Sequence, residues 1–105
     1  MTGDARGHVN FDAINRAALP YLSALLRRWL PDGLQTGAEY TARNPNRSDR
    51  KLGSFRINMN TGKWADFATG DRGGDPVSLA AFLSGKSQAE AARALARMLG
   101  VSQNG

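Results

Sequence analysis

Hydrophobic side chains in the first third of the chain recur every three or four positions, which is the spacing of one face of an α-helix. The positions that follow this period are Phe11, Ile14, Ala18, Leu22, Leu25, Leu26 and Trp29. Pro20 interrupts the pattern, because proline lacks the backbone donor that a helix interior uses. We therefore expect a helix from about 11 to 30 that breaks near Leu19 and Pro20 and ends at the turn-forming residues 31–33.

The middle of the chain changes to an alternating pattern. Residues 54–58 alternate strictly, with Phe55 and Ile57 on one face and polar side chains on the other. Such alternation predicts a strand with one buried face. Residues 60–62 have the composition of a hairpin turn with glycine at its positive-φ position, and 63–67 then return as the partner strand.

A third strand is predicted just before this hairpin. Residues 38–43 have enough β-forming character for one short strand. Residues 34–37 and 44–53 are expected to be loops. The expected sheet therefore has three short antiparallel strands, with basic side chains on one face.

The last third of the chain returns to helix signals. A glycine-rich loop, 68–74, leads into Asp75 and Pro76, an acidic N-cap followed by proline at the first helical position. Ser87 and Glu90 have the spacing of a capping box, which predicts a second helix start. The apolar positions of the final helix are Ala91, Ala94, Leu95, Met98 and Leu99, and Gly100 ends it.

Taken together, these elements predict an α+β fold with a kinked N-terminal helix, a three-stranded antiparallel sheet and two C-terminal helices. We expect one domain over residues 11–100, a flexible arm over 1–10 and a flexible tail over 101–105. A chain of 105 residues has room for one modest hydrophobic core.

Composition narrows the class of protein. The apolar fraction is 41% and the charged fraction 22%, which is typical of a globular protein. The chain contains no cysteine, which excludes disulfides and thiolate metal sites. No apolar run approaches the length of a membrane span, and the N-terminus lacks the apolar core of a signal peptide, so we expect a cytoplasmic protein. The net charge of +5 fits a polyanionic partner, although it also fits a merely soluble basic protein.

Candidate catalytic groups are few. Residues 69–75 resemble a phosphate-binding loop before a helix, but the Gly-Lys-Ser/Thr of a P-loop is missing, so an ordinary loop is the better interpretation. Asp66, Asp71 and Asp75 could supply a carboxylate pair or a hard-metal site, yet Asp75 already serves as an N-cap and Asp66 lies on a predicted strand beside Lys63. The single histidine, His8, has no partners at metal-ligand spacing. We therefore expect neither catalysis nor a metal or cofactor.

Basic and aromatic residues give a stronger signal in the segment 43–75. Cations that follow phosphates, combined with aromatic faces that stack bases, are typical of single-strand binding surfaces. The predicted nucleic-acid-binding residues are Arg43, Arg47, Arg50, Lys51, Arg56, Lys63, Trp64 and Arg72. The alternative is that the arginines lie in solvated loops and that Trp64 supports the sheet. We favour a core position for Phe55 and Phe67.

The order of motifs in this segment resembles a known family. A proline-containing corner (44–47) precedes Gly53-Ser54-Phe55-Arg56-Ile57, a hairpin, Trp64-Ala65-Asp66-Phe67-Ala68-Thr69-Gly70, Gly73-Gly74-Asp75 and two helices. This order is similar to that of the N-terminal zinc-binding ribbons of bacterial, phage and plasmid DNA primases. In that family a Cys-Pro-x-His corner and a Cys-x-x-Cys knuckle hold zinc, and the module helps the primase to engage single-stranded template DNA.

The resemblance covers about residues 39–99, but the metal ligands are replaced. Asn44 and Arg47 stand where the family has its first cysteine and its histidine, and Asp66 and Thr69 stand at the paired cysteines. These four side chains cannot form a tetrahedral zinc site. We expect packing, together with hydrogen bonds among the same four residues, to take over from the metal.

The resemblance implies a metal-free module that binds nucleic acid, single-stranded DNA in preference, in the replication of a mobile element. The sequence is compatible with a fragment of a primase-helicase and with a free-standing relative. The alternative function is a protein-interaction module, an adaptor or inhibitor that docks on a replication or defence complex. Its contacts would come from the helices, with Leu79, Phe82 and Leu83 partly exposed.

Overall fold

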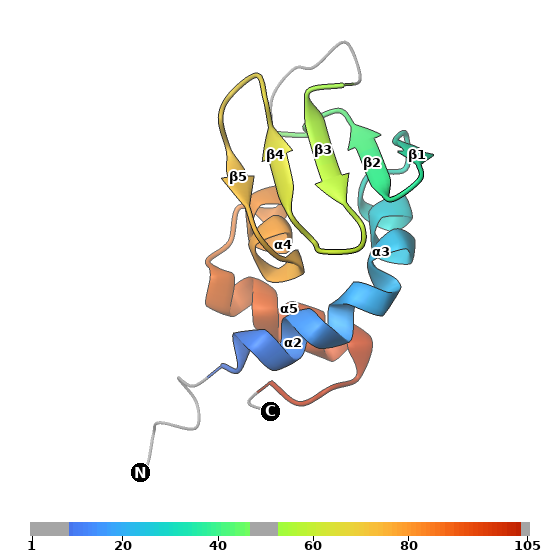
Figure 1. Cartoon of the computed structure of the whole chain (residues 1–105). Helices are drawn as coiled ribbons and strands as arrows, with labels where there is room; N and C mark the ends of the chain where they lie inside the picture. The colour runs from blue at the N-terminus through green and yellow to red at the C-terminus, as the bar shows by residue number, and fades with distance from the viewer. Residues whose placement is uncertain (1–8, 47–52, 104–105) are drawn as a thin grey trace.

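The computed structural model describes residues 9–46 and 53–103. These residues form an α+β fold in which a helical N-terminal segment precedes an antiparallel sheet and two C-terminal helices (Figure 1). The sheet forms one layer, and α3 (Leu22–Trp29) and α4 (Pro76–Ser84) pack against one of its faces. Helices α2 (Phe11–Ala18) and α5 (Gln88–Leu99) lie together beyond the end of the sheet.

The predicted break in the first helix is confirmed. Helix α2 ends at Ala18, a short 3₁₀ segment spans Leu19–Tyr21, and α3 continues to Trp29. Asn10 caps α2, because its side-chain oxygen accepts a hydrogen bond from Ala13 N at 3.0 Å. Pro20 lies in the first turn of the 3₁₀ segment, where its missing N–H is tolerated.

Within the described residues the sheet has five strands, so the prediction of three was wrong. The strands follow one another in sequence order and are β1 (Leu34–Thr36), β2 (Glu39–Ala42), β3 (Phe55–Asn58), β4 (Trp64–Asp66) and β5 (Arg72–Gly73). The two additional strands are the edges, and both were expected to be loops. They contain no alternating apolar pattern, because only their pairing with β2 and β4 makes them strands.

The two C-terminal helices begin and end where the sequence predicts. Asp75 caps α4 in a reciprocal capping box with Ser78, and Ser87 caps α5 in a capping box with Glu90. Each helix is followed by a glycine with left-handed backbone geometry. The capping contacts that define these helix ends join residues close in the sequence, so they depend little on tertiary packing.

The core consists of two clusters. The first lies between the sheet and helices α3 and α4, and its large members include Leu26, Phe55, Ile57 and Leu79. The second lies among α2, α4 and α5, and Trp29 packs against both clusters. Leu79 is fully buried in the first cluster, so the expectation that it is partly exposed was wrong.

Both ends of the described region join the fold. Val9 is buried in the second cluster, and the backbone N–H of Asn10 donates to the carbonyl of Gln103 at 3.0 Å. The remainder of the predicted arm and tail, residues 1–8 and 104–105, lies outside the described residues. Within residues 9–46 and 53–103, no helix is long and apolar enough to cross a bilayer.

Candidate nucleic-acid interface

One row of side chains crosses the outward face of the sheet. The strand register pairs Thr41 with Arg56, Arg56 with Ala65, and Ala65 with Arg72. Because successive side chains of a strand alternate between faces, this row lies opposite the buried Ile57 and Trp64. It therefore places Arg56 and Arg72 on the same open face, with the small side chain of Ala65 between them.

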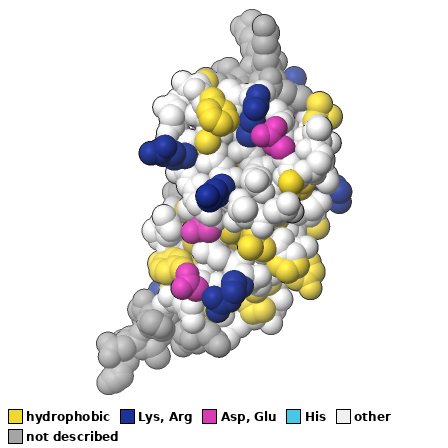
Figure 2. Space-filling model, viewed as in Figure 1, with side chains coloured by type: hydrophobic (Ala, Val, Ile, Leu, Met, Phe, Trp, Pro, Cys, Tyr) yellow, Lys and Arg dark blue, Asp and Glu magenta, His cyan; other side chains and the backbone are white. Residues whose placement is uncertain are grey.

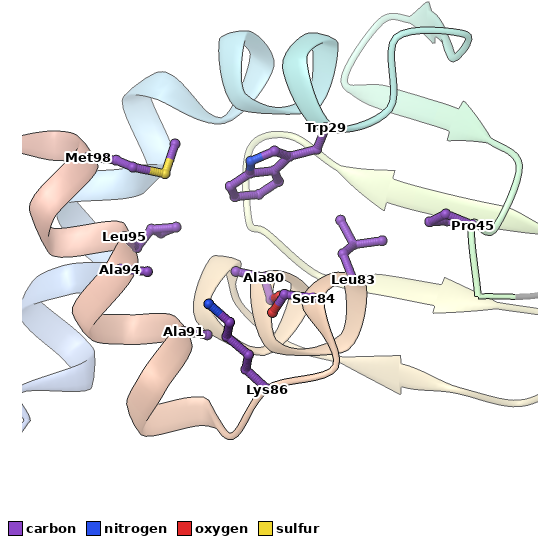
Figure 3. Close-up of a pocket in the computed structure, with 10 residues that line it drawn as sticks. All are labelled: Trp29, Pro45, Ala80, Leu83, Ser84, Lys86, Ala91, Ala94, Leu95 and Met98. Carbon is purple, nitrogen blue, oxygen red and sulfur yellow. The ribbon is translucent and has the colours of Figure 1, made fainter.

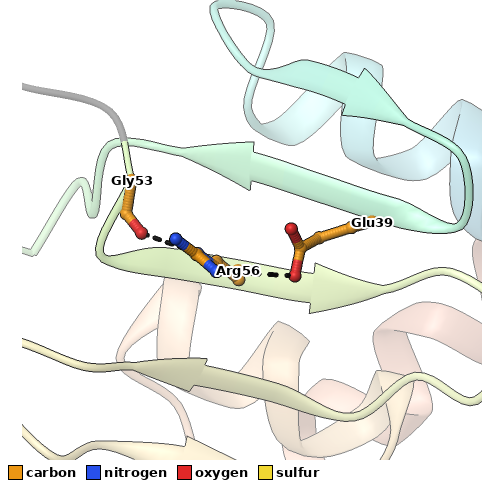
Figure 4. A network of polar contacts seen from close by, with 3 residues as sticks. All are labelled: Glu39, Gly53 and Arg56. Atoms are coloured by element: carbon orange, nitrogen blue, oxygen red, sulfur yellow. Dashed lines mark hydrogen bonds and ion pairs between the residues drawn. The ribbon is translucent and has the colours of Figure 1, made fainter.

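Arg56 is held in position by two contacts (Figure 4). Its Nε donates to the carbonyl oxygen of Gly53 at 2.8 Å, and its Nη1 lies 3.9 Å from Oε2 of Glu39. The arginine and glutamate side chains are 47% and 50% exposed, so water screens this ion pair. The guanidinium thus keeps free donors toward solvent, although Glu39 offsets part of its charge.

Phe67 is the exposed aromatic side chain of this face. It is 71% exposed, and the guanidinium carbon of Arg56 lies 5.6 Å from its ring centroid, within cation–π range. The expected core position of Phe67 was therefore wrong. Alternation along β4 explains the difference, since Trp64 and Asp66 face inward and Ala65 and Phe67 face outward.

A shallow hollow of about 200 Å³ lies beside the ring of Phe67. Its lining includes Ala65, Phe67, Arg56 and Lys63. The other lining residues are Glu39, Asn58 and Trp64.

The remaining cations of the described face are exposed. Lys63 lies just before β4, Arg72 is in β5, and Arg43 follows β2 at the end of the sheet where Phe67 leaves β4. None of these three side chains makes an ion pair within the part of the chain that the structure describes. Figure 2 shows Lys and Arg side chains spread over the sheet, with fewer Asp and Glu and with hydrophobic side chains between them.

Trp64, by contrast, supports the sheet from inside. It is 6% exposed, and its ring centroid lies 4.7 Å from that of Phe82 on α4. Its Nε1 donates to Oγ of Ser78 at 2.9 Å, which satisfies the polar edge of the indole. The structure thus favours the supporting role of Trp64 over base stacking. Tyr40 is likewise buried, and its hydroxyl donates to the carbonyl of Leu30 at 2.6 Å.

Three of the predicted nucleic-acid-binding residues have no described position. Arg47, Arg50 and Lys51 lie outside the described residues. The described part of the candidate interface therefore consists of Arg43, Arg56, Lys63 and Arg72, together with Phe67, which was not among the predicted binding residues.

Two of the four residues compared above with zinc ligands form a buried polar pair. Nδ2 of Asn44 donates to Oδ2 of Asp66 at 2.7 Å, as expected for hydrogen bonds among these residues. The Thr69 hydroxyl instead donates to Asp71, and Arg47 lies outside the described residues. Among residues 9–46 and 53–103, no group of three His, Cys, Asp or Glu side chains could hold a metal ion.

No protein-family model matches this chain, and no curated protein matches it. Its candidate interface must accordingly be interpreted from the residues and their geometry.

Proposed function

We propose that this protein binds single-stranded nucleic acid on the outward face of its sheet. The observation that carries the proposal is the exposed ring of Phe67, which lies against the guanidinium of Arg56 at the edge of a hollow of about 200 Å³. Stacking platforms of this kind, flanked by cations, are the common feature of single-strand binding surfaces.

The cations are spaced to follow a backbone past that ring. Arg56 and Arg72 are two strands apart, which separates their backbones by roughly 10 Å. Lys63 borders the same hollow as Phe67. A base stacked on Phe67 would therefore carry its flanking phosphates toward Lys63 and Arg56 on one side and Arg72 on the other.

A single strand suits this face better than a duplex. The bases of a duplex are stacked on one another and present only their edges, so none could enter a hollow that ends against an aromatic ring. Among the residues that the structure describes, no helix projects from this face that could enter a major groove (Figure 1). The proposal therefore favours unpaired bases, and single-stranded DNA in particular.

The resemblance to primase zinc ribbons supports the same substrate. We propose that the protein is a metal-free accessory module related to those ribbons and acts in the replication of a mobile element. It would not itself be an enzyme. The buried Asn44–Asp66 pair would take the structural place of two ligands, because it ties the corner after β2 to the end of β4.

The test is fluorescence anisotropy of a labelled single strand and its duplex over a salt series. We expect saturable binding that prefers the single strand and weakens with salt, with a slope of ~0.7 for each phosphate neutralised. Phe67→Ala should weaken binding about tenfold or more, since one stacked base contributes roughly 1–3 kcal/mol.

A matched control distinguishes binding at the sheet face from attraction by the net charge of the protein. Lys63→Glu and Arg16→Glu change the net charge equally, but Arg16 is exposed on α2, away from the sheet. We expect Lys63→Glu to weaken binding far more than Arg16→Glu. Equal losses would indicate charge attraction without a site, and absence of binding near physiological salt would contradict the proposed function.

A further inference from the structure

A second candidate surface lies on the helices, away from the outward face of the sheet. A hollow of about 350 Å³ opens between α3, α4 and α5 (Figure 3). The indole of Trp29 points into it from α3, and Leu83, Leu95 and Met98 supply further apolar walls. The small side chains that leave the space open are Ala80, Ser84, Ala91 and Ala94.

A neighbouring hollow continues this surface along α5. It has a volume of about 470 Å³ and lies between α3 and the end of α5, with Tyr21, Leu25 and Leu99 in its lining. Met98 lines both hollows, so they meet at its side chain. Tyr21 is 59% exposed and Met98 49%, so large apolar side chains face solvent along this α3/α5 groove, as we call the two hollows together.

The groove has a cation at each end. Lys86 lines the first hollow and Arg28 lines the second, and none of the described residues that line them is acidic. The nearby carboxylate of Glu90 attracts Lys86, but it forms no ion pair with it among the described residues and accepts a hydrogen bond from the backbone of Ser87 in the capping box. A partner that covers the groove is therefore favoured if it presents carboxylates to Lys86 and Arg28, because covering a cation without an ion-pair partner is costly.

We propose that the α3/α5 groove binds an acidic amphipathic helix of a partner protein. Its two apolar anchors would enter the two hollows on either side of Met98, and Asp or Glu residues near the anchors would pair with Lys86 and Arg28. Helices recognised in grooves present anchors three, four or seven positions apart. On α5, the first hollow is lined by Ala91, Ala94, Leu95 and Met98, and the second by Met98 and Leu99. The centres of the two sets lie about one helical turn apart along α5, which matches anchors three or four positions apart.

A second copy of this chain fits the groove less well. A two-fold dimer places the same patch of both copies face to face. Such an interface would bring together Arg28 and Lys86 of both copies, with no acidic residue among the described groove lining to pair with them. The net charge of +5 on each chain adds to this repulsion. Charge complementarity therefore favours a distinct, acidic partner.

The experiment is selection of a displayed library of random peptides, about four helical turns in length, on the full chain. We expect enriched peptides to be acidic and to carry two apolar residues three or four positions apart. One enriched peptide, synthesised with a fluorescent label, then gives a Kd for the natural chain and for each variant. No enrichment, or enrichment of peptides without this pattern, would overturn the proposal.

Three variants test whether the peptide binds in the α3/α5 groove and not on the sheet face. Met98→Glu places a charge between the two hollows and should weaken peptide binding about tenfold or more. The double variant Arg28→Glu, Lys86→Glu alters only exposed side chains and should weaken it comparably, which guards against a folding defect in Met98→Glu. Phe67→Glu, on the sheet, is the matched control and should leave the peptide Kd unchanged.

Two further results would overturn the assignment. If peptide binding survives both groove variants, the peptide binds elsewhere. If sedimentation shows that the natural chain is a dimer that Met98→Glu dissociates, a second copy covers the groove. Binding of a labelled single strand should be unchanged by Met98→Glu, so this test can fail without affecting the proposed nucleic-acid interface.

Discussion

The amide of Asn44 and the carboxylate of Asp66 form a 2.7 Å hydrogen bond inside the protein, although the two residues are 22 positions apart. Both side chains are almost completely buried, at 1% and 0% exposure. Oδ1 of Asn44 accepts from the backbone of Asn46, and Oδ1 of Asp66 accepts from that of Ala68, so both polar groups have several partners. The pair therefore joins the corner after β2 to the turn after β4.

Removing the carboxylate should destabilise the protein strongly. Asp66→Ala leaves the buried Nδ2 group of Asn44 without this acceptor, and we expect a loss of roughly 2–4 kcal/mol in the free energy of unfolding. Urea unfolding followed by circular dichroism measures it. The matched control is Asp71→Ala, because Asp71 is exposed and its carboxylate accepts a short-range hydrogen bond from the Thr69 hydroxyl. A loss no larger than that of the control would show that the buried pair is not a structural link.

Gly73 should tolerate no side chain. A Cβ at this position would lie 2.4 Å from both Nε1 of Trp64 and Oγ of Ser78. Gly73→Ala should therefore reduce the free energy of unfolding by roughly 1–3 kcal/mol, the usual effect of overpacking. At the adjacent Gly74 an added Cβ has no neighbour within 4 Å, so Gly74→Ala should have little effect on thermal stability. Similar melting temperatures for the two variants would contradict this description of the Trp64 contact.

Glu39 should restrain binding on the sheet face. Its carboxylate lies 3.9 Å from Nη1 of Arg56 and would repel an approaching phosphate. Glu39→Gln removes that charge, so we expect affinity for a labelled single strand to rise about two- to fivefold at low salt. The gain should disappear as salt is raised, because screening removes the repulsion. Unchanged affinity at low salt would place the bound strand away from Arg56.

We expect the free energy of unfolding to fall at alkaline pH because of Tyr40. Burial is the main cause that raises the pKa of its hydroxyl, with partial opposition from the charge of Arg27. Because the raised pKa favours the neutral form in the folded state, this stability is fully present below about pH 10 and is lost as pH rises through the folded pKa.

Tyr40→Phe removes both the ionisable group and the hydrogen bond to Leu30. We expect a loss of about 1 kcal/mol at neutral pH, since the Leu30 carbonyl still accepts from Gly33. Urea unfolding of both proteins between neutral and strongly alkaline pH measures the difference. The advantage of the natural protein should shrink above about pH 10, and an advantage that grows there would contradict the expected direction of the pKa.

Local signals in the sequence were sufficient to predict where the helices begin and end. Asp75 with Pro76 and Ser87 with Glu90 mark helix starts through contacts between residues at most three positions apart, and Pro20 breaks the first helix through its own covalent structure. The alternation of Phe55 and Ile57 likewise identified a central strand and its buried face.

Local sequence patterns could not predict the two edge strands, or that Phe67 is the exposed aromatic residue of the sheet face. Strands β1 and β5 depend on hydrogen bonds to β2 and β4 rather than on their own composition. Trp64 and Phe67 are both plausible stacking residues by type. Strict alternation would have put them on opposite faces, but the polar Asp66 between them obscured which face is buried.

Residue identity and short-range spacing were enough to predict the helices, the central hairpin and the absence of thiolate ligands. The position of Phe67 against Arg56, the contact of Asn44 with Asp66 and the place of Met98 between two hollows could not be predicted in this way. Each of these relationships links separate elements, and its geometry follows from how the sheet and helices pack rather than from any local pattern.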